Sequence, residues 1–599
     1  MARLEADPAL VARGSRTDIT GELIYVPPLD LEAVKRMSEA CAQTQYQGRI
    51  ALLWSHPSGE QAKALAAAGI RGVIAFDSRE RYFDPNQVVY ASGPYDRHDS
   101  LPLGLTVSWR QWSELLEDVQ SAKKVVVRAK ACVEKFPNKF DTVYCWLPGT
   151  EPDAKGMVFT AHLFDGYIKR GANDNMSGCV IQLEILRALC RLIASGELPR
   201  PRRTIHFVWP QEISGMYAFL KEHPGFADGV SFDLNMDMVG EGLRKNNAVL
   251  RMGQSPGHLP TYLDGLARSL LNYVGRTNDF VFMTDVPRGR PGGQYFPIPM
   301  IEKNGSLDAF RFSIQPTING SDQICFYNPA VAVPGIMLLI WPDQWYHADT
   351  DTPDKADPTQ LKRAAFIGAA CAWAAAQCTD DVAAGLAEAA SEYGYLRVAE
   401  REIPRALARL EAADAKNLGT ETSQALSLMD FGAGREIGAL RSIEDVFSGS
   451  PAARQTVAGK SRQWELYRNA LRTQVLQYAQ SRAVQLGVAV PTEPAPDSMQ
   501  RTYEKTVFAI APAVKGRQFD LAASDKYRQY MKEHPDALKT LGITSRQATT
   551  ILNYVNGKRS IAEIGTCVAG ELDEDVPRKG IAGYLELLRS VGWLETVKE

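Results

Sequence analysis

The stretch that most constrains how this chain can fold covers residues 157–178, MVFTAHLFDGYIKRGANDNMSG. It opens with a short apolar run, which predicts a buried strand, and places His162 where that strand should end. The turn-rich GANDN segment then supplies Asp174, and apolar residues at helical spacing begin after Ser177-Gly178. A strand, a loop and a helix in this order put both side chains at the carboxyl edge of an α/β sheet, where such folds carry their sites.

Three later segments supply side chains of the same kinds at comparable places. Residues 204–209 predict a second strand, and Glu212 follows it closely. A third predicted strand ends in Asp237, and much later His347 stands in WYHADT, beside an acid. Because histidine nitrogens and carboxylate oxygens are the donors that hold a catalytic zinc, these residues together predict a metal site.

Over about residues 141–380 the chain resembles the zinc exopeptidases of the bacterial leucyl aminopeptidase and glutamate carboxypeptidase type. That family reads strand-His, then G-A-N-D-N-x-S-G, a Glu-Glu pair, N-x-D-x-x-G, and a histidine followed by Asp-Thr. GANDNMSG is the most specific part of the resemblance. The resemblance implies an α/β fold with a mixed sheet flanked by helices. It also implies hydrolysis of N-terminal peptide bonds by a zinc-activated water.

The family pattern assigns a role to each candidate residue. His162, Asp174 and Asp237 would hold one zinc, and Asp174 would also begin a second metal position with His347. Glu212 would be the general base, which takes a proton from water and passes it to the leaving amine. Residues 320–322, GSD, resemble the part of the family that lines the substrate pocket. The predicted substrate-binding residues are Ser321, Asp322 and Tyr346.

The chain departs from the family pattern at two positions. Counted back from Gly215 without a gap, Glu212 matches the general base and Ile213 falls on a metal ligand. With one inserted residue, Gln211 would replace the base and Glu212 would become the ligand. On the ungapped alignment, which we prefer, the second metal lacks a donor, so we expect one tight zinc and a second that is weak or absent.

The second departure concerns the partner of the first histidine. The family usually has Asp two residues after that histidine, where it orients the ring. Here that place is Phe164, and Asp165 comes one residue late. Ordinary two-zinc activity is therefore in question, although the fold should tolerate both changes.

Two rival functions follow from these departures. One is a different amidohydrolase reaction on the same metal site, with a small amide as substrate. The other is a degenerate peptidase that acts as a peptide- or protein-binding module. Metal content distinguishes the two enzymes from the binding module. The two enzymes are distinguished by whether the chain forms products from amino-acid amides or from acylated substrates.

The length of 599 residues suggests several domains, and four are predicted. Residues 1–135 resemble a protease-associated lid domain, with a generic βαβ unit as the alternative. Residues 136–380 form the catalytic domain, and residues 381–490 are rich in helix-forming residues. Residues 491–599 contain a proline-rich linker and a tail that looks like a winged helix.

Composition excludes some classes of partner. Net charge is only −3, and the basic residues of the tail are balanced by acids, so specific nucleic-acid binding is not expected. No run approaches the length of a membrane span, and the first residues lack the apolar core of a secretion signal. Nine scattered cysteines predict reduced thiols and a cytoplasmic location, although a trimmed start would hide a signal. The helical segment is a candidate surface for forming homo-oligomers.

Overall fold

The protein's structure is a computed structural model that describes most of the chain. The described residues are 10–14, 17–27, 46–76, 84–89, 101–121, 124–131, 137, 139–164, 170–283, 300–447, 449–490 and 498–597. Asp165 and nearly all of the proline-rich linker lie outside them. The seven cysteines within these ranges are all free thiols.

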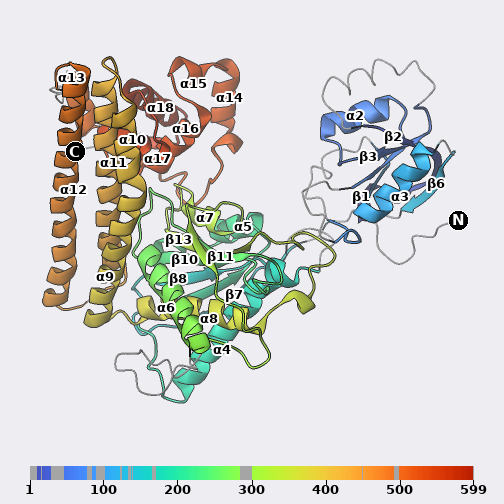
Figure 1. Cartoon of the computed structure of the whole chain (residues 1–599), viewed down its shortest axis with the longest axis horizontal. Coiled ribbons are helices and arrows are strands. Elements are labelled where there is room, and N and C mark those ends of the chain that lie inside the picture. The colour runs from blue at the N-terminus through green and yellow to red at the C-terminus, as the bar shows by residue number, and fades with distance from the viewer. Residues whose placement is uncertain are drawn as a thin grey trace.

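The site lies on a seven-stranded mixed sheet with the order β12-β11-β13-β10-β8-β9-β7 (Figure 1). Its central strands β8, β9, β10 and β13 run parallel, whereas β7 pairs antiparallel with β9 and β11 pairs antiparallel with β13 but parallel with β12. The bounds are β7 (Val143–Leu147), β8 (Gly156–Thr160), β9 (Ile205–Trp209), β10 (Val230–Met236), β11 (Val249–Gly253), β12 (Phe312–Gln315) and β13 (Gly335–Trp341). Every residue of β8 and β10 is buried, as expected for parallel strands covered on both faces. The predicted mixed sheet flanked by helices is confirmed.

Helices cover both faces of this sheet because alternate strand residues point to opposite sides. One face, with Phe159 and Leu234, packs on α4 (Gly178–Ala194), α6 (Leu263–Met283) and α8 (Pro358–Ala376). The opposite face, with Val158 and Val208, packs on α5 (Ser214–Glu222) and α7 (Gln323–Tyr327). Thr160 and His162 follow Val158 at two-residue spacing, so the site opens beside α5 and α7.

The N-terminal unit is a separate six-stranded sheet with the order β1-β5-β4-β3-β2-β6. Its elements are β1 (Leu10–Gly14), β2 (Thr17–Tyr25), β3 (Ile50–Leu53), α2 (Gly59–Ala67), β4 (Gly72–Ala75), β5 (Leu103–Thr106), α3 (Trp109–Gln120) and β6 (Val126–Ala131). Strands β3 and β4 are parallel and joined by α2, whose N-terminus is closed by a capping box at Ser58. The alternative βαβ arrangement is therefore present, and the protease-associated identity stays a prediction.

Long helices form the third unit, drawn in yellow to orange in Figure 1. They are α9 (Asp380–Arg397), α10 (Ile403–Ala412), α11 (Leu418–Arg441) and α12 (Pro451–Leu486). A fully buried guanidinium, Arg397, pairs with Glu402 and Glu436 at 2.7 Å each. Each helix within the described ranges is too short or too polar to cross a lipid bilayer.

The C-terminal unit has a core that other units complete. Its elements are α13 (Ser498–Lys505), β14 (Phe508–Ile510), α14 (Asp525–Glu533), α15 (Ala537–Thr540), α16 (Ser545–Asn553), α17 (Ile561–Leu572), α18 (Arg578–Ser590) and β15 (Leu594–Thr596). Phe431 of α11 and Ala330 of the catalytic unit both belong to its buried core. Helices α11 and α17 approach closely at Gly570, where a Cβ atom would lie 2.3 Å from the Cβ atom of Phe431. The winged-helix identity of this unit remains a prediction.

Candidate metal centre

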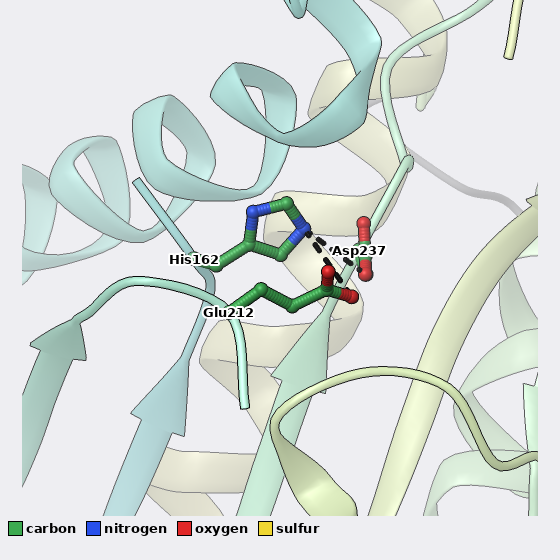
Figure 2. Close-up of side chains that lie close together, drawn as sticks. All are labelled: His162, Glu212 and Asp237. Atoms are coloured by element: carbon green, nitrogen blue, oxygen red, sulfur yellow. Dashed lines mark ion pairs between the residues drawn. The ribbon is translucent and has the colours of Figure 1, made fainter. Parts of the chain in front are cut away.

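Three side chains converge at the carboxyl ends of neighbouring parallel strands (Figure 2). His162 lies two residues after β8, Glu212 three residues after β9, and Asp237 directly after β10. The Nε2 atom of His162 is 3.5 Å from Oδ2 of Asp237 and 4.0 Å from Oε1 of Glu212. Potential ligand atoms of the three residues all lie within 4.8 Å of one another. The sheet therefore brings these predicted residues together.

Asp174 places its carboxylate between two histidines. Its Oδ1 atom lies 3.3 Å from Nε2 of His162, and its Oδ2 atom lies 3.2 Å from Nε2 of His347. The residue stands in the segment Ala172–Ser177, just before α4, where its own backbone is not helical, and it is buried. This geometry fits a carboxylate shared between two metal positions, which is the role that the sequence predicted.

Two further acids hold the segment that carries Asp174. The carboxylate of Asp351 accepts the backbone N–H groups of Asn173 at 2.7 Å and of Asp174 at 3.1 Å. The Asn173 side chain donates to Asp343 at 3.2 Å. Sequence reasoning missed both acids. The doubled Asp-Thr of residues 349–352 was the available signal for Asp351, because it offers a second acid within four residues of His347.

A third buried acid, Glu241, stands behind Asp343 and was also missed. Its carboxyl group hydrogen-bonds Asp343 and accepts from the Asn246 side chain. Burial, Asp343 and Asp351 raise the pKa of Glu241 to about 10, so this carboxyl group is protonated at neutral pH. Burial also raises the pKa of Asp343, and it raises that of Asp351 to about 6.

The donor set fits a zinc ion. Ligand atoms about 2.0–2.2 Å from one tetrahedral zinc lie about 3.3–3.6 Å apart. The distances from His162 to Asp174 and Asp237 match this spacing, whereas the 4.0 Å to Glu212 is longer. Nε2 of His162 is buried without a hydrogen-bond partner in the described part of the chain, as a metal-facing atom would be.

Electrostatics around His162 also favour a cation. Burial lowers the pKa of His162, but the nearby Asp237 and Asp174 outweigh it and raise the pKa well above its usual value. A proton and a metal ion therefore compete for the same nitrogen. The other ring nitrogen, Nδ1, has no acceptor among the described residues, in keeping with Phe164 at the place of the orienting acid.

Ile213 adopts a left-handed backbone conformation, with φ of 55°, between Glu212 and helix α5. Its N–H donates to the carboxylate of Asp322 at 2.8 Å, and the N–H of Glu212 donates to the carbonyl of Phe164 at 2.9 Å. The Ile213 side chain packs against the apolar cluster below the sheet edge. These contacts fix the turn that presents Glu212.

The predicted substrate-binding residues fall into two groups. Ser321 and Asp322 are completely buried at the start of α7, where Asp322 supports the Ile213 turn. Tyr346 is partly exposed, and its ring stacks on the His347 ring with centroids 3.6 Å apart. Contact of any of the three with substrate remains a prediction.

The chain can be compared with known proteins by sequence and by structure. No curated protein matches the sequence. Among solved structures, the chain is similar to an aminopeptidase from Aneurinibacillus sp. strain AM-1, with 16% identity, a TM-score of 0.37, and coverage of 61% of this chain and 76% of that chain. It is also similar to the zinc aminopeptidase BSAP from Bacillus subtilis, with 17% identity, a TM-score of 0.41, and coverage of 61% and 76%.

A third similar structure is the peptidase M28 precursor from Shewanella amazonensis SB2B, with 16% identity, a TM-score of 0.40, and coverage of 61% and 76%. Likeness at these levels carries no argument about fold or activity. The sequence gives the more specific comparison. Residues 142–285, the segment with His162, Asp174, Glu212 and Asp237, match the model of Peptidase family M28.

Proposed function

We propose that this chain is a zinc-dependent aminopeptidase, which hydrolyses the N-terminal peptide bond of a peptide substrate. The observation that carries the proposal is the position of His162 Nε2, with two carboxylates at 3.3 and 3.5 Å. This spacing suits one tetrahedral zinc, and it occurs inside the segment that matches Peptidase family M28.

The residues of the site have separate roles. His162, Asp174 and Asp237 would hold the ion and leave a position open. Bound there, zinc supplies Lewis acidity, which polarises a carbonyl and makes water nucleophilic near neutral pH. At 4.0 Å from His162, Glu212 is too far for the ligand spacing but close enough to reach a water in the site. Glu212 would take the proton from that water and pass it to the leaving amine.

The second metal position has two donors, Oδ2 of Asp174 and Nε2 of His347. Among the described residues the group of three whose ligand atoms all lie close together is His162, Glu212 and Asp237, which includes neither Asp174 nor His347. Asp174 joins the tight site through its 3.3 Å distance to His162, whereas His347 reaches the metal centre through its contact with Asp174. Two donors hold a zinc ion weakly, because catalytic zinc sites in proteins have three protein ligands. We therefore expect one tight zinc, with His347 acting mainly on Asp174 and on substrate.

Charge favours the amino end of a peptide. One zinc beside the carboxylates of Asp174, Asp237 and Glu212 leaves the site with a net negative charge. A free α-ammonium group is attracted to such a site, and a C-terminal carboxylate is repelled.

The test is metal analysis of the purified chain, with activity measured on amino-acid amides and on N-acylated amides before and after chelation. We expect one zinc per chain and cleavage of free amides, lost on chelation and restored by zinc. Asp174→Ala should lose both zinc and activity and keep its circular dichroism spectrum. The exposed Asp445→Ala is the matched control.

Cleavage of only the acylated amides would replace the aminopeptidase with another amidohydrolase. A folded chain that holds no zinc would overturn the proposal and leave a peptide-binding module in its place.

A further inference from the structure

A short segment of the N-terminal unit, residues 84–89, docks on the loop that carries His347. The side chain of Gln87 contacts the loop at two points. Its Nε2 atom donates to the carbonyl of Gln344 at 3.3 Å, and its Oε1 atom accepts from the hydroxyl of Thr350 at 2.8 Å. These two residues bracket His347 at three positions on either side.

The backbone of the same segment adds a short antiparallel pairing. The N–H of Val88 donates to the Asp349 carboxylate at 2.9 Å, and the N–H of Asp349 donates to the carbonyl of Val88 at 3.1 Å. A β-bridge joins Val89 to Ala348. Gln87, Val88 and Val89 are each at most 3% exposed, so this contact is a buried interface.

The docking segment is itself fixed to the N-terminal unit. The N–H of Arg110, in the first turn of α3, donates to the carbonyl of Pro85 at 2.9 Å. The Arg110 guanidinium donates to the Asn86 side chain at 2.7 Å. A continuous set of contacts therefore runs from α3 through Gln87 to the His347 loop.

His347 needs such support because its backbone is left-handed, with φ of 56°. A non-glycine residue keeps this conformation only where the surrounding structure determines it. The result is a ring whose Nε2 atom lies 3.2 Å from Asp174. Gln87 holds the loop on both sides of the residue, and on the Gln344 side Asn246 holds it as well, so loss of Gln87 would loosen the position of the ring.

We infer that Gln87 is a positioning residue for His347, so that the N-terminal unit helps to build the active site. The inference rests on the proposed function only in assigning His347 to the metal centre. The N-terminal unit then does more than stand beside the site, because turnover depends on a contact that it supplies.

The experiment follows the imidazole signal of His347 by NMR in the zinc-free full-length chain with labelled histidine, assigned by its loss in His347→Asn. Gln87→Ala should shift or broaden this signal and leave that of His162 in place. Gln87→Glu keeps the acceptor for Thr350 and loses the donor, so its effect should be intermediate. Thr350→Val removes the hydrogen bond to Gln87 without changing the shape of the side chain. This variant replaces Gln87→Ala in the experiment if Gln87→Ala does not fold.

The control is Gln61→Ala, which alters a glutamine of the same unit in the capping box of α2. It should leave the His347 signal unchanged. In the zinc-loaded chain, Gln87→Ala should lower kcat/KM by about 10- to 100-fold, the usual effect of removing a partner that orients a metal-site residue.

An unchanged His347 signal in Gln87→Ala and Thr350→Val would overturn the inference, and with zinc bound and turnover intact it would leave the proposed function standing. A chain that binds no zinc but whose His347 signal responds to Gln87→Ala would uphold the positioning role and overturn only the proposed function.

Discussion

Replacing Glu241 with glutamine should stabilise the protein, increasingly so as the pH rises. The substitution keeps the shape of the side chain. It also keeps both hydrogen bonds, since the amide can accept from Asn246 and donate to Asp343. What it removes is a proton that the folded chain must retain.

The size of the effect follows from the pKa difference. Unfolded Glu241 loses its proton near pH 4.5, whereas the folded carboxyl group holds it up to about pH 10. Between these values the folded state binds one more proton, so the free energy of unfolding falls as pH rises, by about 1.4 kcal/mol per pH unit. Between pH 5 and 8 the free energy of unfolding of wild type should therefore fall by about 4 kcal/mol, and that of Glu241→Gln should not show this fall.

The assay is thermal unfolding in the presence of a chelator. The transition to follow is that of the catalytic unit, which a separate run identifies as the transition that added zinc shifts. At about 2–4 °C per kcal/mol for a unit of this size, the variant should gain about 10 °C on wild type between pH 5 and 8. Glu184→Gln, on an exposed pair with Arg187, is the control and should show no such trend. A Tm difference between Glu241→Gln and wild type that stays constant over this range would refute the assignment of a protonated Glu241.

Three other outcomes are expected. Glu212→Gln should keep the tight zinc by elemental analysis and lose about 10²- to 10⁴-fold in kcat, because a general base contributes on that order; loss of zinc would make Glu212 a ligand. His347→Ala should keep one tight zinc, and a fall in stoichiometry from two to one on this substitution would show that the second position is filled. The full chain should give no gel shift with duplex DNA at physiological salt, because the charges of its C-terminal unit are mixed; a persistent shift would contradict this.

The sheet edge could be predicted because its signals are local. A short apolar run followed by a polar residue marks the end of a buried parallel strand, and β8 and β10 end beside His162 and Asp237 as that pattern requires. The start of α6 was harder. This helix begins at Leu263, three residues after Pro260, a residue that suits a first turn better than a helix interior.

Contacts between remote segments could not be predicted in this way. Asp343 and Glu241 look like any other acids along the chain, and only the fold brings them close to the segment that carries Asp174. Gln87 lies 257 positions from Gln344, its hydrogen-bond partner, in a segment without a motif. Strand β14 was missed because it is three residues long and pairs with β15 across most of the C-terminal unit.

The shared core of the C-terminal unit has a consequence for biosynthesis. Phe431 and Ala330 leave the ribosome well before the residues of β15 that close this core. Domains generally fold as units during synthesis, N-terminal first, so the catalytic and helical units can form while the tail is still being made. The tail then condenses on a surface that already exists, with Gly570 admitting the Phe431 ring. Until that moment the nascent chain exposes an apolar patch, which is where a chaperone would be expected to bind.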